Sequence, residues 1–369
     1  MDNKIITTIV ALKKYDLKTG FAFLAIDTFG LHLSKTASMI PDNKQPAIAK
    51  ALQESFDTDS FDNIQMLTKG LSGALVFKIT VHGMPYLLRI ISHTRDKPEY
   101  YFDCLQTAAN AGIAPRIHYL NIEDKISITE FIEDQYFSIP VARIKMADTL
   151  RSLHTLPKFA YRLNFFDASD TFLQKFLASD IVPKKNMKDI IEQYERIVNV
   201  YPRDDQKSLV SCHNDVKRDN IIFDGVRPWL VDWEAARLND RYLDLAAIAN
   251  FVIKNDNDET EFLKRYFGDA FDEYKQARFF LMRQVVHMFC FTLCSIPGSA
   301  GKPIDIDMIS PGFNEFHERL WNCEISLEGN DAILRYALVH LKELRNNIQI
   351  NRFDESLRIV ADYNKAAII

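Results

Sequence analysis

The feature that most constrains the fold is a polar block enclosed by short apolar stretches, between residues 209 and 232. It reads Ser211-Cys-His-Asn-Asp-Val-Lys-Arg-Asp-Asn-Ile-Ile-Phe-Asp-Gly and is followed by Trp229-Leu-Val-Asp-Trp-Glu234. The aliphatic and β-branched flanks favour strands, and the polar residues between them favour a loop. Helical periodicity dominates the chain on both sides, so we predict a strand-like island within a helical region.

The spacing within this block indicates phosphoryl-transfer chemistry. It fits the pattern H-x-D-x-x-x-x-N through His213, Asp215 and Asn220, and Asp232 lies 17 residues beyond Asp215. In phosphoryl transfer the protein must orient the acceptor hydroxyl and neutralise charge on the phosphates with metal ions. Asp215 can accept the hydroxyl proton, while Asn220 and Asp232 offer oxygen ligands that suit Mg²⁺. The alternative, a chance combination of turn residues, is weakened by the apolar flanks.

These residues resemble the aminoglycoside phosphotransferase and choline kinase family, whose fold is similar to that of protein kinases. The resemblance extends over roughly residues 47 to 350. It implies that Asp215 is the catalytic carboxylate, that Asn220 and Asp232 bind magnesium, and that His213 supports the loop. It also implies ATP and Mg²⁺ as cofactors and a small-molecule hydroxyl as the acceptor.

The periodicity of the chain changes near Pro140 and suggests two lobes. Strand-forming stretches dominate before it, at residues 64–69, 74–81, 86–91, 116–120 and 125–132, and helical stretches dominate after it. We predict an α+β, protein-kinase-like fold with residues 46–134 as a small antiparallel-sheet N-lobe and residues 135–369 as a mainly helical C-lobe. Residues 1–45 are interpreted as an N-terminal extension that serves as a packing appendage or homodimer contact.

The predicted nucleotide site begins with the segment Gly70-Leu-Ser72-Gly73 between two strands. The family places its phosphate-covering loop there, and missing side chains would let backbone amides approach the phosphates. A plain hairpin turn is the alternative, because the third glycine of G-x-G-x-x-G is absent. The segment from residue 129 to 134 resembles the family hinge, so Glu130 and Ile132 are assigned to the adenine.

Arg89 lies on an otherwise apolar strand, in a position that resembles the L-L-R of choline kinases. A buried cation needs an anionic partner, and Glu99 on the next helix is the first candidate, with Asp96 and Asp103 as alternatives. An edge-strand arginine that faces water is the other interpretation.

Two further residues near the block receive supporting roles from the resemblance. Lys217 resembles the protein-kinase lysine that meets the transferred phosphate, although a solvated loop lysine would look the same. Asp244 resembles the aspartate that braces the catalytic loop from below, and a simple helix N-cap is the alternative. Either role of Asp244 is structural.

The acceptor is predicted from the pattern Asp232-Trp-Glu234, which resembles the choline kinase branch. Trp233 and Trp321 could help to form an aromatic cage for a quaternary ammonium, although aromatic residues at helical spacing are core residues by default. Negative charge at Glu234, Asp240 and Glu261 would favour a cationic acceptor such as choline or ethanolamine.

Other functions remain open. An aminoglycoside O-phosphotransferase is the alternative of the same class, and a nucleotide-binding pseudokinase that acts as an interaction module is the alternative of another class. A protein-kinase function is disfavoured because no A-P-E motif follows Asp232.

Composition and charge narrow the possible partners of the protein and its cellular compartment. A formal net charge of −5 gives no electrostatic reason to expect nucleic acid. The five cysteines form no dense framework, which favours reduced thiols and a cytoplasmic protein. The longest apolar stretch, residues 277–296, contains Arg278, Arg283, Gln284 and His287 and is predicted to be a buried helix, not a membrane span. His287, Cys290 and Cys294 share one face of it and are interpreted as core residues, since no fourth metal ligand is evident.

Overall fold

The structure, a computed structural model, describes residues 40–67, 74–91 and 99–366 of the chain. The chain divides into two compact units, each built around its own core. Unit 1 takes the chain up to Tyr136 together with Asp219–Ala236, and unit 2 takes Phe137–Arg218 and Arg237–Ile369. The sequence predicts that Asp219–Ala236 belongs to the helical lobe, whereas this segment groups with the sheet. Residues 1–39, most of the predicted N-terminal extension, lie outside the described residues.

Unit 1 contains a five-stranded sheet in the order β1-β2-β3-β5-β4, and every neighbouring pair is antiparallel. The strands are β1 (Asn63–Met66), β2 (Ala74–Val81), β3 (Met84–Ile91), β4 (Ile117–Asn121) and β5 (Ile126–Glu130). His82 and Gly83 link β2 to β3 with positive φ at both positions, the backbone that a tight hairpin turn requires. Alternate strand residues such as Phe77 and Ile79 are buried with the apolar face of α2 (Gln45–Phe56), and this cluster forms the core of the sheet.

The later segment of unit 1 is tied to the earlier one by backbone hydrogen bonds. It contains a hairpin of β7 (Ile221–Phe223) and β8 (Pro228–Leu230), preceded by η4 (Arg218–Asn220) and followed by η5 (Trp233–Ala235). The amide of Leu230 donates to the carbonyl of Ile113, just after α3 (Glu99–Asn110), at 2.9 Å. The amide of Gln135 donates to the carbonyl of Phe223 at 2.7 Å.

Unit 2 is mainly helical, with a single two-stranded antiparallel sheet among its described residues. The sheet pairs β6 (Leu209–Cys212) with β9 (Arg237–Asp240). The predicted strand-like island therefore contributes to two separate sheets: β6 pairs with β9, and β7 pairs with β8. The helices are α4 (Ile139–Leu153), α5 (Phe165–Ala178), α6 (Lys188–Val200), α7 (Arg241–Val252), α8 (Asp256–Phe267), α9 (Glu273–Ser299), α10 (Phe313–Trp321), α11 (Asn330–Asn347) and α12 (Asn351–Ala366).

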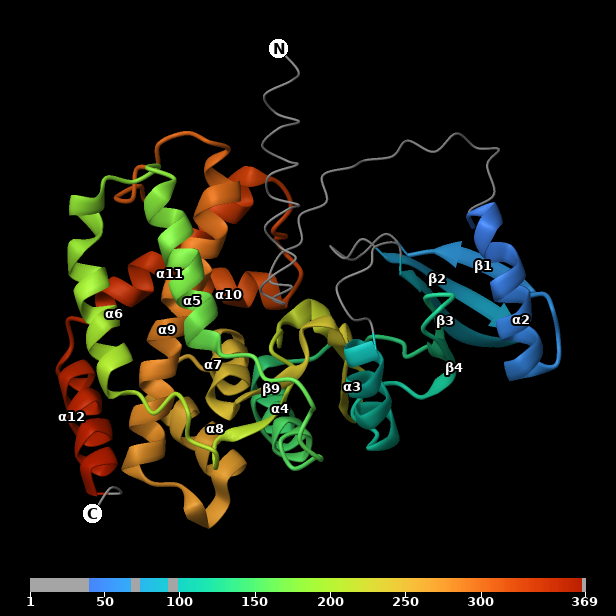
Figure 1. Cartoon of the computed structure of the whole chain (residues 1–369), viewed down its shortest axis with the longest axis horizontal. Coiled ribbons are helices and arrows are strands. Elements are labelled where there is room, and N and C mark those ends of the chain that lie inside the picture. The colour runs from blue at the N-terminus through green and yellow to red at the C-terminus, as the bar shows by residue number, and fades with distance from the viewer. Residues whose placement is uncertain (1–39, 68–73, 92–98, 367–369) are drawn as a thin grey trace. The chain divides into compact units, whose positions relative to one another are not determined.

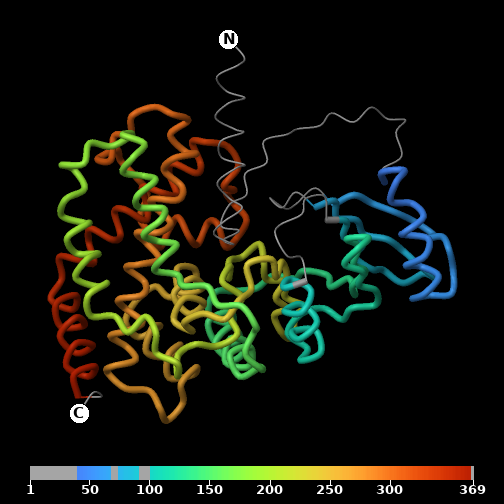
Figure 2. The backbone as a smooth tube through the Cα atoms, viewed as in Figure 1, coloured from blue at the N-terminus to red at the C-terminus, as the bar shows by residue number. Residues whose placement is uncertain are grey.

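Helix α9 is the central element of unit 2, and α5, α7, α11 and α12 all contact it. Among the described residues it alone is long and apolar enough to cross a membrane, and 83% of its apolar window is buried inside the protein. The predicted buried helix is thus confirmed. Helix α12 also lies beside α6, far from it in sequence, so the end of the chain closes against an earlier helix of the same unit (Figures 1 and 2).

Candidate active site

The loop that carries Asp215 begins where β6 ends and is fixed by Asp244 in the first turn of α7. The Asp244 carboxylate accepts the amide of His213 at 2.8 Å through Oδ2 and the amide of Asn214 at 2.7 Å through Oδ1. Asn214 has φ +64°, in the left-handed region that asparagine enters more readily than most other non-glycine residues, and these two bonds hold the backbone there. The N-cap of α7 is Asp240, whose side chain accepts the amide of Tyr242. Asp244 thus contacts the loop while another aspartate caps the helix.

Asp215 is buried and forms an ion pair within its own loop. Lys217 Nζ lies 2.9 Å from Asp215 Oδ2, and the lysine side chain is partly exposed. The amide of Asp215 donates to His213 Nδ1 at 3.3 Å, so the histidine supports the backbone of the loop. An ammonium at this distance favours the ionised form of the carboxylate. The loop therefore presents a carboxylate that can accept a proton and a cation that can meet an anionic group.

Cysteine side chains on α9 lie close enough to this loop to sense its charges. Burial, with a contribution from the charge of Asp215, raises the pKa of the Cys290 thiol to about 12. Burial also raises the pKa of Cys294 well above its ordinary value. Both thiols are therefore protonated and buried, as expected of core cysteines.

Asn220 and Asp232, the predicted magnesium ligands, both belong to unit 1. The amide of Val231 donates to the carbonyl of Asn220 at 3.0 Å, which joins the backbones that carry the two side chains. Asp232 has φ +63° and ψ 65°, a left-handed conformation that is uncommon for aspartate and is often found at functional positions. One amide oxygen and one carboxylate are hard ligands, so the donor set fits Mg²⁺ together with phosphates and water.

Arg89 on β3 contacts this candidate metal site directly. Its Nη2 donates to Asp232 Oδ1 at 3.1 Å and to Glu234 Oε1 at 2.7 Å, and 12% of its side chain is exposed. Burial opposes the charge of Arg89, but Tyr101 and the two carboxylates outweigh it and raise its pKa above the ordinary value. The predicted partner, Glu99, has a side chain outside the described residues. The arginine thus connects the sheet to Asp232 and Glu234, two residues that had been assigned to metal and acceptor.

The remaining predicted nucleotide residues lie at or beyond the end of β5. Glu130 is exposed at the last position of β5, and its amide donates to the carbonyl of Arg116 at 2.8 Å. Ile132 is half-buried in the chain that follows, which leads to the bond between Gln135 and Phe223. Gly70, Ser72 and Gly73 lie outside the described residues.

The two tryptophans predicted to meet the acceptor are buried in different units. Trp233 is 1% exposed, and its indole N–H donates to the carbonyl of Leu230 at 3.0 Å within unit 1. Trp321 is 2% exposed in unit 2, where its N–H donates to the carbonyl of Phe137 at 2.6 Å and its ring packs near Phe251. Buried rings with satisfied N–H groups are typical of core residues.

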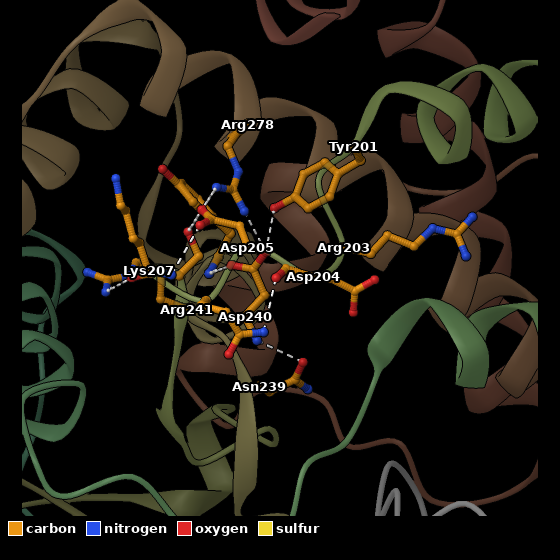
Figure 3. Close-up of polar contacts among 12 residues, drawn as sticks. Tyr201, Arg203, Asp204, Asp205, Lys207, Asn239, Asp240, Arg241 and Arg278 are labelled. Atoms are coloured by element: carbon orange, nitrogen blue, oxygen red, sulfur yellow. Dashed lines mark hydrogen bonds and ion pairs between the residues drawn. The ribbon is translucent and has the colours of Figure 1, made fainter. Parts of the chain in front are cut away.

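Asp240, also predicted to meet the acceptor, belongs to a buried polar network (Figure 3). Its Oδ2 pairs with Arg278 Nη2 at 2.8 Å and accepts the hydroxyl of Tyr201 at 3.0 Å. Arg278 also donates to Asp205 at 2.7 Å and to Ser208 at 2.8 Å. The carboxylate of Asp240 is therefore paired inside the protein with an arginine that it shares with Asp205.

All three carboxylates that were expected to attract a cation are paired with an arginine. Each has an arginine partner within its own unit: Glu234 with Arg89, Asp240 with Arg278 and Glu261 with Arg143. Each of these arginines also contacts a second carboxylate, Asp232, Asp205 and Asp258 respectively, so the pairing reduces the negative charge of each cluster without cancelling it.

Three contributors near the site were not identified from the sequence: His154, Tyr101, and Arg278 as the partner of Asp240. Their partners lie on other elements of the chain: Tyr101 on α3 acts on Arg89 of β3, Arg278 contacts Asp240 from 38 residues away, and His154 contacts Asp244 from 90 residues away. No spacing rule links such pairs, and only the pairing of elements reveals them.

A comparison with known families decides the class of the chain. A model of the phosphotransferase enzyme family matches residues 63–280, more than half of the chain, from β1 into α9. The chain belongs to this phosphotransferase family. The matched region includes Asp215, Asn220 and Asp232, so the predicted family is confirmed.

Individual relatives of this phosphotransferase are distant in sequence. Protein LicA of Haemophilus influenzae is 23% identical over 230 residues, which cover 58% of this chain and 83% of that protein. A choline/ethanolamine kinase family protein from Mesorhizobium loti superposes with a TM-score of 0.63 at 19% identity and covers 86% of this chain and 99% of its own. Choline kinase LicA from Streptococcus pneumoniae gives 0.56 at 16% identity, with 82% and 99% covered. These similarities confirm the predicted kinase-like α+β fold.

Proposed function

We propose that this phosphotransferase is a small-molecule kinase that transfers a phosphoryl group from Mg·ATP to the hydroxyl of an amino alcohol such as choline or ethanolamine. The observation that carries the proposal is the ion pair of Asp215 and Lys217 on a loop fixed by Asp244. A buried carboxylate in a fixed orientation is what an enzyme needs to align an acceptor hydroxyl for in-line attack.

Asp215 would accept the hydroxyl proton as the bond to phosphorus forms. Lys217, 2.9 Å away, would keep the carboxylate ionised and would approach the transferred phosphoryl group. His213 would keep the backbone of the loop in register through its bond to the Asp215 amide.

Asn220 and Asp232 would hold the metal ion, and Arg89 would keep Asp232 in place. Bound Mg²⁺ neutralises negative charge on the nucleotide phosphates. Arg89 contributes indirectly, because its bonds to Asp232 and Glu234 restrict how the carboxylates can turn. An arginine can hold two carboxylates at once because its guanidinium offers several donors in one plane.

The choline or ethanolamine acceptor is supported by the Asp232-Trp-Glu234 pattern and by the names of the similar structures. The predicted acidic residues give it limited support, since each is paired with an arginine that a second carboxylate shares, which leaves each cluster with some negative charge. Shape and aromatic contacts would also contribute to the selection of a cationic acceptor.

The test is ADP release from Mg·ATP against a panel of choline, ethanolamine, other amino alcohols and several aminoglycosides. We expect one amino alcohol to stimulate ADP release, and Asp215→Asn to reduce the rate by about 10²- to 10⁴-fold, the range for loss of a general base. Asp219→Asn is the matched control, because it makes the same change at an exposed position of the same loop.

Three outcomes would count against the proposal in different ways. Stimulation by an aminoglycoside alone would keep the kinase and change the acceptor. Nucleotide binding without turnover on the whole panel would favour a pseudokinase. Failure to bind Mg·ATP would contradict the assigned cofactors.

A further inference from the structure

Three histidines meet inside unit 2 at the junction of three helices, and the proposed chemistry uses none of them. They are His287 on α9, His317 on α10 and His340 on α11, and all three side chains are fully buried. The ring centroid of His340 lies 5.1 Å from that of His287 and 5.2 Å from that of His317. The ring of Phe313 on α10 lies 5.1 Å from His287 and 5.4 Å from His340, so α10 packs against both of the other histidines.

The hydrogen bonds of this histidine cluster are suited to neutral rings. His317 Nδ1 lies 2.9 Å from the carbonyl of Phe313, which can only accept, so this nitrogen carries the proton. His287 Nδ1 and His340 Nδ1 lie 2.9 Å apart, so one donates to the lone pair of the other. Among the described residues, the Nε2 atoms of the three rings have no hydrogen-bond partner. A proton added at Nε2 would have no acceptor, and a proton added to the accepting Nδ1 would place N–H against N–H.

The cations nearest to the cluster also oppose an added positive charge. Arg283, one turn before His287 on α9, acts on all three rings, and Lys254, between α7 and α8, acts on His317. Burial is the larger effect: it lowers the pKa of His317 to about 3 and the pKa of the other two rings well below the ordinary value. The three rings are therefore neutral near pH 7.

The carboxylates near the cluster act on these cations. Glu259 of α8 lies 3.9 Å from Arg283 Nη1, and Glu343 of α11 acts on the same arginine. Glu318 of α10 lies 3.5 Å from Lys254 Nζ. The cations that face the rings are thus held in place by acidic partners of their own.

The remaining groups packed against the cluster are neutral in acid. Tyr336 on α11 packs against His340 with ring centroids 4.5 Å apart, and its hydroxyl donates to Cys290 Sγ on α9 at 4.0 Å. Burial raises the pKa of the phenol well above its ordinary value and the pKa of the thiol to about 12. Helix α7 contributes the apolar ring of Phe251, 5.3 Å from His317. A proton on the cluster therefore creates a buried charge that these groups do not compensate.

This arrangement makes the junction sensitive to acid. A histidine in water takes up a proton near pH 6.5, whereas the buried rings take it up only at lower pH. The stability that the neutral rings provide is complete above about pH 6.5 and is lost as the pH falls toward about 3. Each histidine that gains a proton on opening favours the open state by about tenfold per pH unit, so three favour it by about 1,000-fold.

Helix α10 is the element of the junction that opens most readily. It has nine residues, and residues 300–312 and 322–329 on either side of it form neither helix nor strand. Helices α9 and α11 have 27 and 18 residues and pack extensively against each other. Helix α10 can therefore leave the cluster while its two neighbours stay folded.

Release of α10 would disturb the loop that carries Asp215. Arg218 lies three residues beyond Asp215, and its guanidinium is 5.6 Å from the ring centroid of Trp321, the last residue of α10. This contact ends when α10 leaves, so the loop loses a surface against which it packs.

We propose that His287, His317 and His340 form an acid switch that releases α10 from α9 and α11 as three protons bind, and that this release lowers phosphoryl transfer. The switch itself is independent of the proposed function. Only its effect on catalysis rests on that function.

The first test is hydrogen–deuterium exchange of the α10 amides at several values between about pH 7 and pH 4.5, corrected for the intrinsic rate at each pH. We expect the protection of α10 to fall by up to about 1,000-fold per pH unit, and the protection of α5 in the same unit to fall less. Return to pH 7 should restore the protection. Parallel loss in α5 and α10 would mean that unit 2 unfolds as a whole, and irreversible loss would mean acid damage; either result would overturn the proposal.

The second test replaces each histidine of the cluster with phenylalanine, which keeps a ring of similar size but takes up no proton. Each variant should lower the pH dependence of α10 protection by about one proton, or tenfold per pH unit. A merely structural effect would shift protection equally at every pH, and an unchanged slope in all three variants would contradict the switch. The wild-type comparison of α5 with α10 needs no variant, so it decides the proposal even where a variant fails to fold.

His154→Phe is the matched control for this slope. It also removes a buried histidine of unit 2 whose pKa is lowered by burial, but His154 contacts Tyr266 and Asp244, away from α10. We expect the α10 slope to stay at three protons in this variant. A slope reduced as much as in His317→Phe would mean that it reports global unfolding, which would refute the release of α10.

The effect on catalysis is measured with the acceptor that stimulates ADP release. The wild-type rate should fall reversibly as the pH decreases below about 6.5, and His317→Phe should move this fall to lower pH. A fall at the same pH in both proteins would break the link between α10 and catalysis. If wild-type protein turns over no acceptor, the proposed function fails, while the exchange results still decide the switch.

Discussion

Replacing Arg278 with methionine would remove a buried cation from the polar network of unit 2 (Figure 3). The arginine side chain is 2% exposed and donates to Asp205, Ser208 and Asp240 at 2.7 to 2.8 Å. Methionine keeps much of the apolar volume of the side chain but makes none of these bonds. The network links α9 to β9 and to the turn before β6, the strand that leads into the Asp215 loop.

The expected loss of unfolding free energy depends on which of the two carboxylates stays buried without the arginine. Asp205 is 27% exposed and can be hydrated, and it keeps its bond to the Ser208 hydroxyl. Asp240 is only 8% exposed and cannot be hydrated in the same way, although it still accepts hydrogen bonds from the Tyr201 hydroxyl and the Tyr242 amide. One uncompensated buried charge remains, and removing one partner of such a pair costs about 3 to 5 kcal/mol of unfolding free energy.

Urea unfolding would measure this loss, with Trp321 as the probe of unit 2. The chain has three tryptophans, and the other two, Trp229 and Trp233, belong to unit 1. A background in which both are phenylalanine therefore makes fluorescence specific for unit 2. The matched control is Arg265→Met, which removes an exposed arginine that binds Asp148 through two nitrogens at 2.7 Å each.

We expect the control to change the unfolding midpoint little, because exposed ion pairs are solvated and contribute weakly. If Arg278→Met were no more destabilising than Arg265→Met, burial would not determine the contribution of this ion pair. The buried pair of Arg278 and Asp240 would then contribute no more to the stability of unit 2 than an exposed ion pair does.

Three other predictions follow from single contacts. Arg89→Met should weaken Mg·ATP binding in calorimetry by about 10- to 100-fold, because Asp232 loses a charged hydrogen bond. His317→Phe should reduce the acid sensitivity of unit 2. Burial lowers the pKa of His317 to about 3, so its stabilisation is complete above the unfolded pKa of about 6.5 and is lost as pH falls, at about 1.4 kcal/mol per pH unit. Urea unfolding at several pH values would detect the shallower slope. Gly298→Ala should cost about 1 to 3 kcal/mol in urea unfolding, because its Cβ would lie 2.7 Å from the backbone nitrogen of Leu334.

The sequence was most informative where function depends on neighbours along the chain. Asp215 and Lys217 are two residues apart on one loop, so their ion pair needs no distant partner. The His82-Gly83 turn and the buried α9 were also predictable, since turn chemistry and apolar content are local properties. The helical content of residues 135–369 is local in the same way: α12, for example, buries Phe353, Leu357 and Val360 at helical spacing.

Only the tertiary structure decided which charged groups meet. Arg89 was expected to pair with Glu99 on the next helix, yet its described bonds go to Asp232 and Glu234, 143 and 145 residues away. Asp240 was expected to face an acceptor and instead binds Arg278.

The physical reason is that contacts between sequence neighbours and contacts between distant residues depend on different properties of the chain. Spacing fixes the chemistry that one loop can present, because neighbouring side chains share a backbone. The partner of a buried charge depends on which helices and strands pack together, and that choice results from burial across the whole core. The sequence alone therefore determined the family and the residues of the Asp215 loop, while the packed structure determined which arginines the carboxylates pair with and what holds Asp244 in place.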